Sequence, residues 1–181
     1  PYQKLLYEGF GIKKAMPYKW DKMFTVLKNS DLLVDFFTNN TTQSYGFEYK
    51  GSKIHIEECS VTDGSFLSER IIFKGIIIII ENDGSIVNGL SKYTAKSANK
   101  IQSDKFDSDF YNIFKLFENA YRTKNIKIAR FDNKTVIAIG TNKQFSDVMY
   151  LKYSLYDPSY FKTMYQQIIS VINLVDFINM K

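Results

Sequence analysis

Three side chains that can do chemistry alternate along one short segment: His55, Glu57 and Cys59. His55 is the only histidine and Cys59 the only cysteine of the chain. Residues two apart in a β-strand point to the same face of the sheet, so a regular strand over residues 53–61 would place all three on one face. Cysteine with histidine is a pair used in nucleophilic catalysis, and both residue types bind zinc.

The spacing of these residues argues against both kinds of site. Four residues of strand separate His55 from Cys59 by about 13 Å. A nucleophile and its base need a separation of about 3 Å, and zinc ligands must lie within about 2.3 Å of one point. We therefore expect no bound metal and no cofactor. His55 and Glu57, about 6.6 Å apart along the strand, remain able to share an ion through a third group.

Glu58 is the unusual residue of the segment, because it shares a face with Ile54 and Ile56. A carboxylate that points at an apolar core is costly unless it is paired. A bulge after Ile56, a strand end, or pairing with a residue such as Arg70 across the next strand would each explain it. A functional carboxylate with a raised pKa is the alternative. If the chain is catalytic, the candidate residues are thus His55, Glu57 and Glu58.

Sequence motifs that would identify an enzyme are absent: there is no phosphate-binding loop, dinucleotide fingerprint, nucleophile elbow or zinc-protease motif. The 24 basic residues exceed the 19 acidic ones, for a net charge of +5. The basic residues are spread along the chain, and their densest groups, Lys13-Lys14 and Lys19 with Lys22, are short. We interpret them as solvated surface, and a domain that binds anionic lipid or nucleic acid is the alternative.

The centre of the predicted sheet is the run 66–81, because it holds five consecutive isoleucines, Ile76 to Ile80. Such a run cannot alternate between core and solvent, so we expect it to be buried on both faces, with a bulge at Gly75. Before it, residues 43–50 and 53–61 form a candidate hairpin that turns at Gly51-Ser52. The later strand predictions are 91–96, a hairpin over 125–140 that turns at Asp132-Asn133, and 148–155.

Two amphipathic helices are predicted to cover this sheet, residues 106–121 and 159–179, the second beginning after Asp157 as the N-cap. Residues 2–14 and 18–28 also have helical spacing, 31–37 is ambiguous between helix and strand, and the polar run 38–42 is predicted as a loop. The predicted fold is a single α+β domain over residues 1–181. It has a helical segment over 1–40, and over 41–181 a mixed, mainly antiparallel sheet with its packing helices. We expect the N-terminal helices to pack at a sheet edge.

The single cysteine excludes an intrachain disulfide, and no apolar window is long enough to span a membrane. No signal-peptide pattern is present. The chain begins at Pro1 rather than Met, so we expect a fragment or a processed form, whose anchor could lie upstream.

The order of these elements resembles a bacterial family known only as domain of unknown function 3137. The resemblance lies in Phe47 with the unit 53–58 (KIHIEE), in the core-strand unit 72–77 (IFKGII), and in the C-terminal series. That series comprises the 106–121 helix, 126–131, Asp132-Asn133, 136–139, Phe145 and the closing helix.

The resemblance implies an uncharacterised, often membrane-anchored protein without assigned catalytic residues. We accordingly expect a non-catalytic interaction or scaffold domain on the cytoplasmic face of the inner membrane, or in the cytoplasm if there is no anchor. Its partner would be a membrane protein or the membrane surface. The alternatives are an enzyme that uses His55, Glu57 or Glu58, and a mildly basic binder of anionic lipid or nucleic acid. Neither the partner nor the oligomeric state follows from the sequence.

Overall fold

The computed structural model describes residues 8–9, 11–14, 16, 18–33, 38–63, 70–82, 87–94, 108–123, 125–141 and 158–179. These residues form an α+β fold, as predicted. The helices are α2 (Trp20–Ser30), α3 (Ser108–Tyr121) and α5 (Pro158–Asn179). The strands are β1 (Lys13–Lys14), β2 (Thr38–Tyr49), β3 (Ser52–Asp63), β4 (Arg70–Glu81), β5 (Val87–Thr94), β6 (Ile126–Asp132) and β7 (Lys134–Gly140).

The described strands make one sheet in the order β1-β2-β3-β4-β7-β6-β5, and each pairing between them is antiparallel. The β6–β7 hairpin turns near Asp132 and Asn133, as predicted. The β2–β3 hairpin turns one residue earlier than predicted. Tyr49 pairs with Ser52, and the two residues between them, Lys50 and Gly51, have φ values of 48° and 80°. Positive φ at both positions is typical of the tight turn whose twist matches that of the strands.

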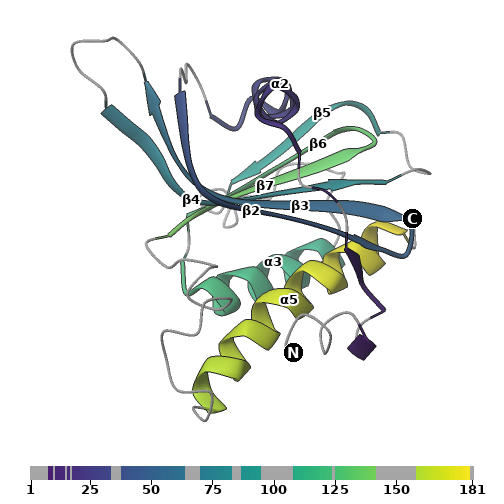
Figure 1. The fold of residues 1–181 in the computed structure, drawn as a ribbon. Coiled ribbons are helices and arrows are strands. Elements are labelled where there is room, and N and C mark those ends of the chain that lie inside the picture. The colour runs from purple at the N-terminus through teal and green to yellow at the C-terminus, as the bar shows by residue number, and fades with distance from the viewer. Residues whose placement is uncertain are drawn as a thin grey trace.

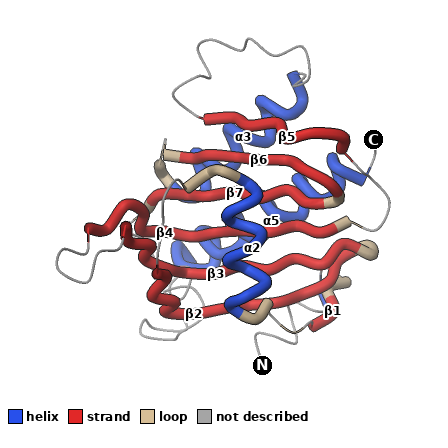
Figure 2. The backbone as a smooth tube through the Cα atoms, turned by 90° about the horizontal axis from the view of Figure 1, so that it is seen from above, coloured by secondary structure: helices blue, strands red, loops and turns tan. Residues whose placement is uncertain are grey.

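The helices lie on both faces of the sheet (Figure 1). Helices α3 and α5 cover one face, and α2 crosses the strands on the other (Figure 2). The prediction that the N-terminal helices pack at a sheet edge is therefore wrong for α2. The physical reason is that the second face is also apolar, and burial of Met23 and Leu27 from α2 against it removes both surfaces from water.

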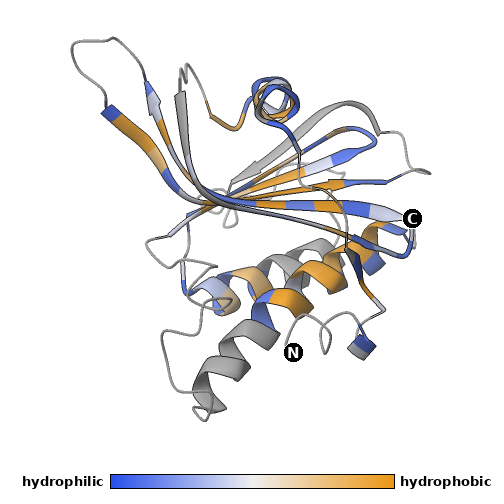
Figure 3. Ribbon diagram, viewed as in Figure 1, coloured by the Kyte–Doolittle hydropathy of each residue, from blue (hydrophilic) through white to orange (hydrophobic). Residues whose placement is uncertain are grey.

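The isoleucine run of β4 holds the two layers together, as predicted. Ile76, Ile78 and Ile80 pack in the cluster under α3 and α5, whereas Ile77 and Ile79 pack in the cluster under α2. All five side chains are at most 1% exposed. Figure 3 shows the apolar residues concentrated between the layers. Because β4 is buried on both faces and pairs with β3 and β7, these three strands form the centre of the sheet.

Gly75 is needed for a close approach between strands and does not mark a bulge. It pairs with both Cys59 of β3 and Gly140 of β7. A Cβ atom at this position would lie 2.0 Å from the carbonyl oxygen of Ile139. The irregularity of this strand pair lies between Val61 and Thr62 instead. The predicted bulge is thus displaced toward the end of the β3–β4 pair.

The N-terminal segment departs from its prediction in two further places. Lys13–Lys14 pairs with β2 as a strand, so the helix predicted over 2–14 does not extend this far. The polar run 38–42 is not a loop but the first part of β2, in which residues 38–41 pair with 59–62 of β3. The long neighbouring strand supplies partners for its backbone, which overrides the polar side chains.

The remaining predictions are either tested for part of their residues or concern residues outside the described ones. Helix α2 ends at Ser30, with Asp31 in a left-handed conformation, so the start of the ambiguous segment 31–37 is neither helix nor strand. Residues 34–37, the predicted strand 148–155 and the predicted N-cap Asp157 are outside the described residues. In the portion of the chain that the structure describes, no helix has both the length and the hydropathy needed to cross a bilayer.

Candidate functional site

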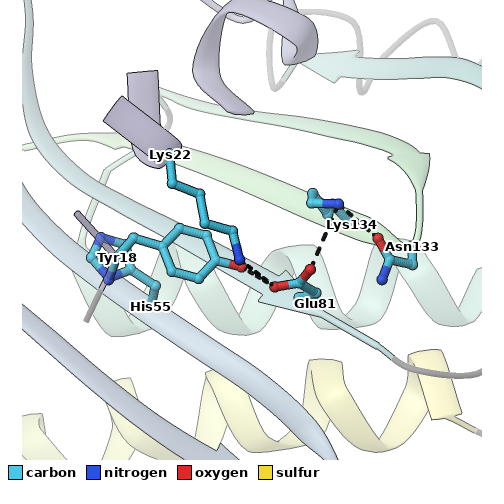
Figure 4. Close-up of polar contacts among 6 residues, drawn as sticks. All are labelled: Tyr18, Lys22, His55, Glu81, Asn133 and Lys134. Carbon is cyan, nitrogen blue, oxygen red and sulfur yellow. Dashed lines mark hydrogen bonds and ion pairs between the residues drawn. The ribbon is translucent and has the colours of Figure 1, made fainter. Parts of the chain in front are cut away.

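Tyr18, two residues before the start of α2, contacts His55, the only histidine of the chain. The backbone N–H of Tyr18 donates a hydrogen bond of 3.0 Å to Nδ1 of His55. The two rings are stacked, with centroids 5.0 Å apart and an angle of 10° between their planes (Figure 4). Tyr18 precedes α2, which crosses this face of the sheet, and it therefore lies over β3, the strand that carries His55.

The other ring nitrogen of His55 faces the interior. Its Nε2 lies 3.0 Å from Oε2 of Glu57 and 3.2 Å from the sulfur of Met23. His55 is 1% exposed and Glu57 is 3% exposed. These two side chains therefore meet directly, without the third group that the strand spacing suggested. Glu57 also accepts a hydrogen bond from the hydroxyl of Thr41 on β2.

This geometry fixes the tautomer of neutral His55. A backbone N–H can only donate, so Nδ1 must be the acceptor and the ring proton must be on Nε2. Nε2–H points toward Glu57, whose carboxylate oxygen can accept a hydrogen bond from it. Both nitrogens of the imidazole are consequently engaged inside the protein.

The outer end of the site is a charged cluster around Glu81 of β4. The phenol of Tyr18 donates to Oε2 of Glu81, and Nζ of Lys22 lies 3.1 Å from the same oxygen. Nζ of Lys134 lies 3.7 Å from Oε1 of Glu81 and donates to the side chain of Asn133 (Figure 4). We call the set Tyr18, Lys22, His55, Glu57, Glu81 and Lys134 the His55 network.

Lys22 adds a second contact at this end, with its Nζ 4.0 Å from the centroid of the Tyr18 ring. A cation over an aromatic face is attracted by the negative π-cloud. The phenol of Tyr18 is thus fixed on one side by the stacked His55 and bonded at its tip to Glu81.

The protonation states of the outer cluster follow from these contacts. Burial raises the pKa of Tyr18, and the neighbouring Glu81 raises it further, so the phenol keeps its proton and donates. Partial burial opposes ionisation of Glu81, but the hydrogen bonds from Tyr18 and Lys22 and the charges of Lys22 and Lys134 outweigh it and lower its pKa. Glu81 is therefore an ionised acceptor.

Cys59 lies on the same face but takes no part in the network. It is 3% exposed and packs among the apolar side chains under α2. Burial raises the pKa of its thiol, and the charges of Glu57 and Glu58 raise it further. Because the thiolate is the nucleophilic form of cysteine, Cys59 is unreactive in this position.

Glu58 points to the opposite face, under α3 and α5, and is 4% exposed. The strand register is regular from Ile54 to Val61, so neither a bulge after Ile56 nor a strand end explains its burial. Arg70 lies opposite Asp63, at the far end of β3, so the predicted pairing of Arg70 with Glu58 is wrong. Glu58 instead lies near Tyr121 of α3, whose pKa is raised by burial and by this carboxylate.

The structure thus brings His55 and Glu57 together and places Glu58 on the other side of the sheet. Sequence reasoning missed Tyr18, Lys22, Glu81 and Lys134, which come from three separate segments with no shared motif. Among the described residues, no group of three or more His, Cys, Asp or Glu side chains could hold a metal ion.

Comparison with known proteins gives no relative from which a role could be transferred: no family model matches the chain, and no curated protein or solved structure matches it significantly.

Proposed function

We propose that this chain is a non-enzymatic interaction domain, carried on the cytoplasmic face of the inner membrane by an anchored bacterial protein of the domain of unknown function 3137 family. The observation that carries the non-enzymatic part is the state of His55. Its Nδ1 accepts from Tyr18, and its Nε2 is bonded to Glu57, with the ring 1% exposed. A general base needs a free nitrogen within reach of a substrate proton, and His55 offers none.

The other candidate groups support the same proposal. The thiol of Cys59 is buried with a raised pKa, and Glu58 lies beneath α3 and α5 on the opposite face. The imidazole, the thiol and this carboxylate are thus all buried, where a substrate does not reach them. The membrane location rests on the family resemblance alone.

Large apolar side chains that remain exposed are the first places to look for a partner. Among the described residues these are Met16, Ile71 and Leu116, which are 88%, 59% and 41% exposed. They lie before α2, at the start of β4 and on α3, so they sample three separate regions of the surface.

The experiment is site-specific photo-crosslinking in the native host, with the full-length protein carrying the probe at position 16, 71 or 116. A probe at buried Val61 serves as the negative control. The proposal predicts one adduct of defined mass, formed from a single exposed position and recovered in the carbonate-washed membrane fraction. No adduct at any position, with the protein wholly soluble, would contradict it.

An enzyme that uses His55 and Glu57 is the second candidate, because a carboxylate 3.0 Å from an imidazole nitrogen is the arrangement that orients a histidine base. It requires that Tyr18 move away to free Nδ1. The His55→Asn variant separates the two proposals, since an asparagine carbonyl can replace Nδ1 as acceptor but cannot act as a base. A normal cellular phenotype with folded His55→Asn protein would exclude the enzyme.

A further inference from the structure

We propose that His55 is a proton-operated latch, which holds the segment entering α2 on the sheet when the imidazole is neutral and releases it when the imidazole is protonated. The proposal concerns the conformation of the domain and does not depend on the function proposed above. It rests on the hydrogen bond that Tyr18 N–H donates to Nδ1 of His55.

This hydrogen bond requires an unprotonated Nδ1. A protonated imidazole carries N–H groups at both positions and has no acceptor left. Tyr18 N–H and His55 Nδ1–H would then point at each other as two donors. Because the donor of Tyr18 belongs to the backbone, it cannot reverse its role as a hydroxyl or an amide side chain can. Protonation and the closed contact are therefore mutually exclusive.

The bond from His55 to Glu57 does not oppose the release. Nε2 carries a proton in both the neutral and the protonated ring, so the contact with Oε2 of Glu57 is available in both states. In the released state the imidazolium keeps this partner and presents Nδ1–H to water. Of the two ring nitrogens, only Nδ1 thus changes its hydrogen bond between the closed and released states.

The charged and titratable groups around His55 come from each element packed against it. On β3 these are Glu57 and the raised-pKa thiol of Cys59, and from the α2 side they are Tyr18 and Lys22. Glu81 of β4 and Lys134 of β7 follow beyond the Tyr18 ring. The pKa of Glu81 is lowered and that of Tyr18 is raised, so neither changes charge as pH falls from neutral to mildly acidic. An imidazole is the side chain whose ordinary pKa lies in that range.

The sign of the linkage follows. The closed state excludes the proton on Nδ1 and the released state accepts it, so the released state binds more protons and gains population as pH falls. One such proton changes the ratio of released to closed protein by up to about tenfold per pH unit.

The release is expected to be local. Farther along α2, Met23 and Leu27 are fully buried against the sheet, and Lys127 of β6 donates to the carbonyl oxygen of Leu32 just after the helix. These contacts do not involve His55 Nδ1. The moving part is thus the segment around Tyr18, which carries the phenol away from Glu81.

The test is amide hydrogen exchange of the whole chain by NMR, between about pH 8 and about pH 5, corrected for intrinsic exchange rates. The single histidine lets its ring resonances report its protonation in the same samples without ambiguity. We expect the protection of the Tyr18 amide to fall by up to about tenfold per pH unit as the imidazole gains its proton, while the Leu27 amide stays protected.

Two variants make the test specific. His55→Asn keeps an acceptor for Tyr18 N–H and takes up no proton, so the pH dependence at Tyr18 should vanish. Tyr18→Phe keeps the backbone N–H and the ring and lacks only the hydroxyl that bonds Glu81, so the protection of the residue-18 amide should fall at every pH, with an unchanged midpoint of its pH dependence. The proposal is overturned if Tyr18 protection is independent of pH in the unmodified protein, whether or not the ring titrates, or if the dependence persists in His55→Asn.

Discussion

The backbone nitrogen of Tyr18 lies 3.0 Å from Nδ1 of His55, although the two residues are 37 positions apart in the chain. This contact, together with the stacked rings, fixes where the chain enters α2 and so how the helix crosses the sheet. It also gives the only histidine a structural role, because the nitrogen that could serve as a base is already an acceptor.

Replacing His55 by Ala should destabilise the domain strongly. The change leaves the Tyr18 N–H and the buried carboxylate of Glu57 without the imidazole, and each buried polar group that loses its partner costs about 1–3 kcal/mol. His55→Asn, which restores an acceptor for Tyr18, should lose less. Denaturant unfolding of both variants at one pH checks the order, and equal stability would contradict the role of Nδ1.

Stability should fall at acid pH through Glu81. Its pKa is below the ordinary value in the folded protein, so its contribution is fully present above the unfolded-state pKa. The contribution is lost as pH falls through the lower, folded-state pKa. Glu81→Gln should therefore be less stable than the unmodified protein near neutral pH, with the gap narrowing in acid. A difference in unfolding free energy that stays constant with pH would mean that ionisation of Glu81 does not stabilise the fold.

Gly75→Ala should be far more damaging than Gly51→Ala. At Gly75 the added methyl group would lie 2.0 Å from a backbone oxygen of β7, whereas at Gly51 nothing lies within 4 Å of it. Overpacking in a rigid sheet costs about 1–3 kcal/mol or more, and a positive φ with open space costs about 1 kcal/mol. Thermal unfolding of the two variants compares them directly. Similar losses would argue against the close approach of β4 and β7.

Cys59 should react slowly with a water-soluble disulfide reagent in the folded protein. Its thiol is buried, and its pKa is raised, so little thiolate is available. The reaction should become fast in denaturant, and the ratio of the native to the denatured rate should give the same free energy of opening as hydrogen exchange at Ala138, which is in the same buried cluster. Rapid labelling under native conditions would show that the α2 face opens more readily than the packing suggests.

A version of the chain that ends near residue 99 should aggregate. It would lack α3, β6, β7 and α5, and so would expose the isoleucine run of β4 along one strand edge and one face. An exposed apolar strand edge is a template for pairing with other chains. Light scattering after expression of the truncated and full chains distinguishes them. A soluble, monomeric truncation would contradict the central position of β4.

The sequence was sufficient for the parts of the fold that depend on local pattern. The isoleucine run predicted a strand buried on both faces, and the 3.6-residue spacing predicted the helices over 106–121 and 159–179, within two residues of their observed starts. The turn at Asp132 and Asn133 was also evident from residue types. In each case the signal lies within one segment of the chain.

The missed features depend on contacts between distant segments. The position of α2 across the sheet needs the face formed by β3, β4, β6 and β7, which no single segment reveals. The strand over residues 38–42 forms because β3 is long enough to pair with it, despite the polar side chains. The His55 network joins residues 18 and 22 to 81 and 134, and only the tertiary fold brings these together.

The most direct test of this account is nitrogen-15 NMR of the imidazole of His55 in the folded protein at about pH 8. We predict a neutral ring with the proton on Nε2, an unprotonated Nδ1, and a coupling across the hydrogen bond from the Tyr18 amide. A proton on Nδ1, or a ring that exchanges rapidly between tautomers, would contradict it. Either result would mean that the Tyr18 amide does not hold the imidazole through Nδ1.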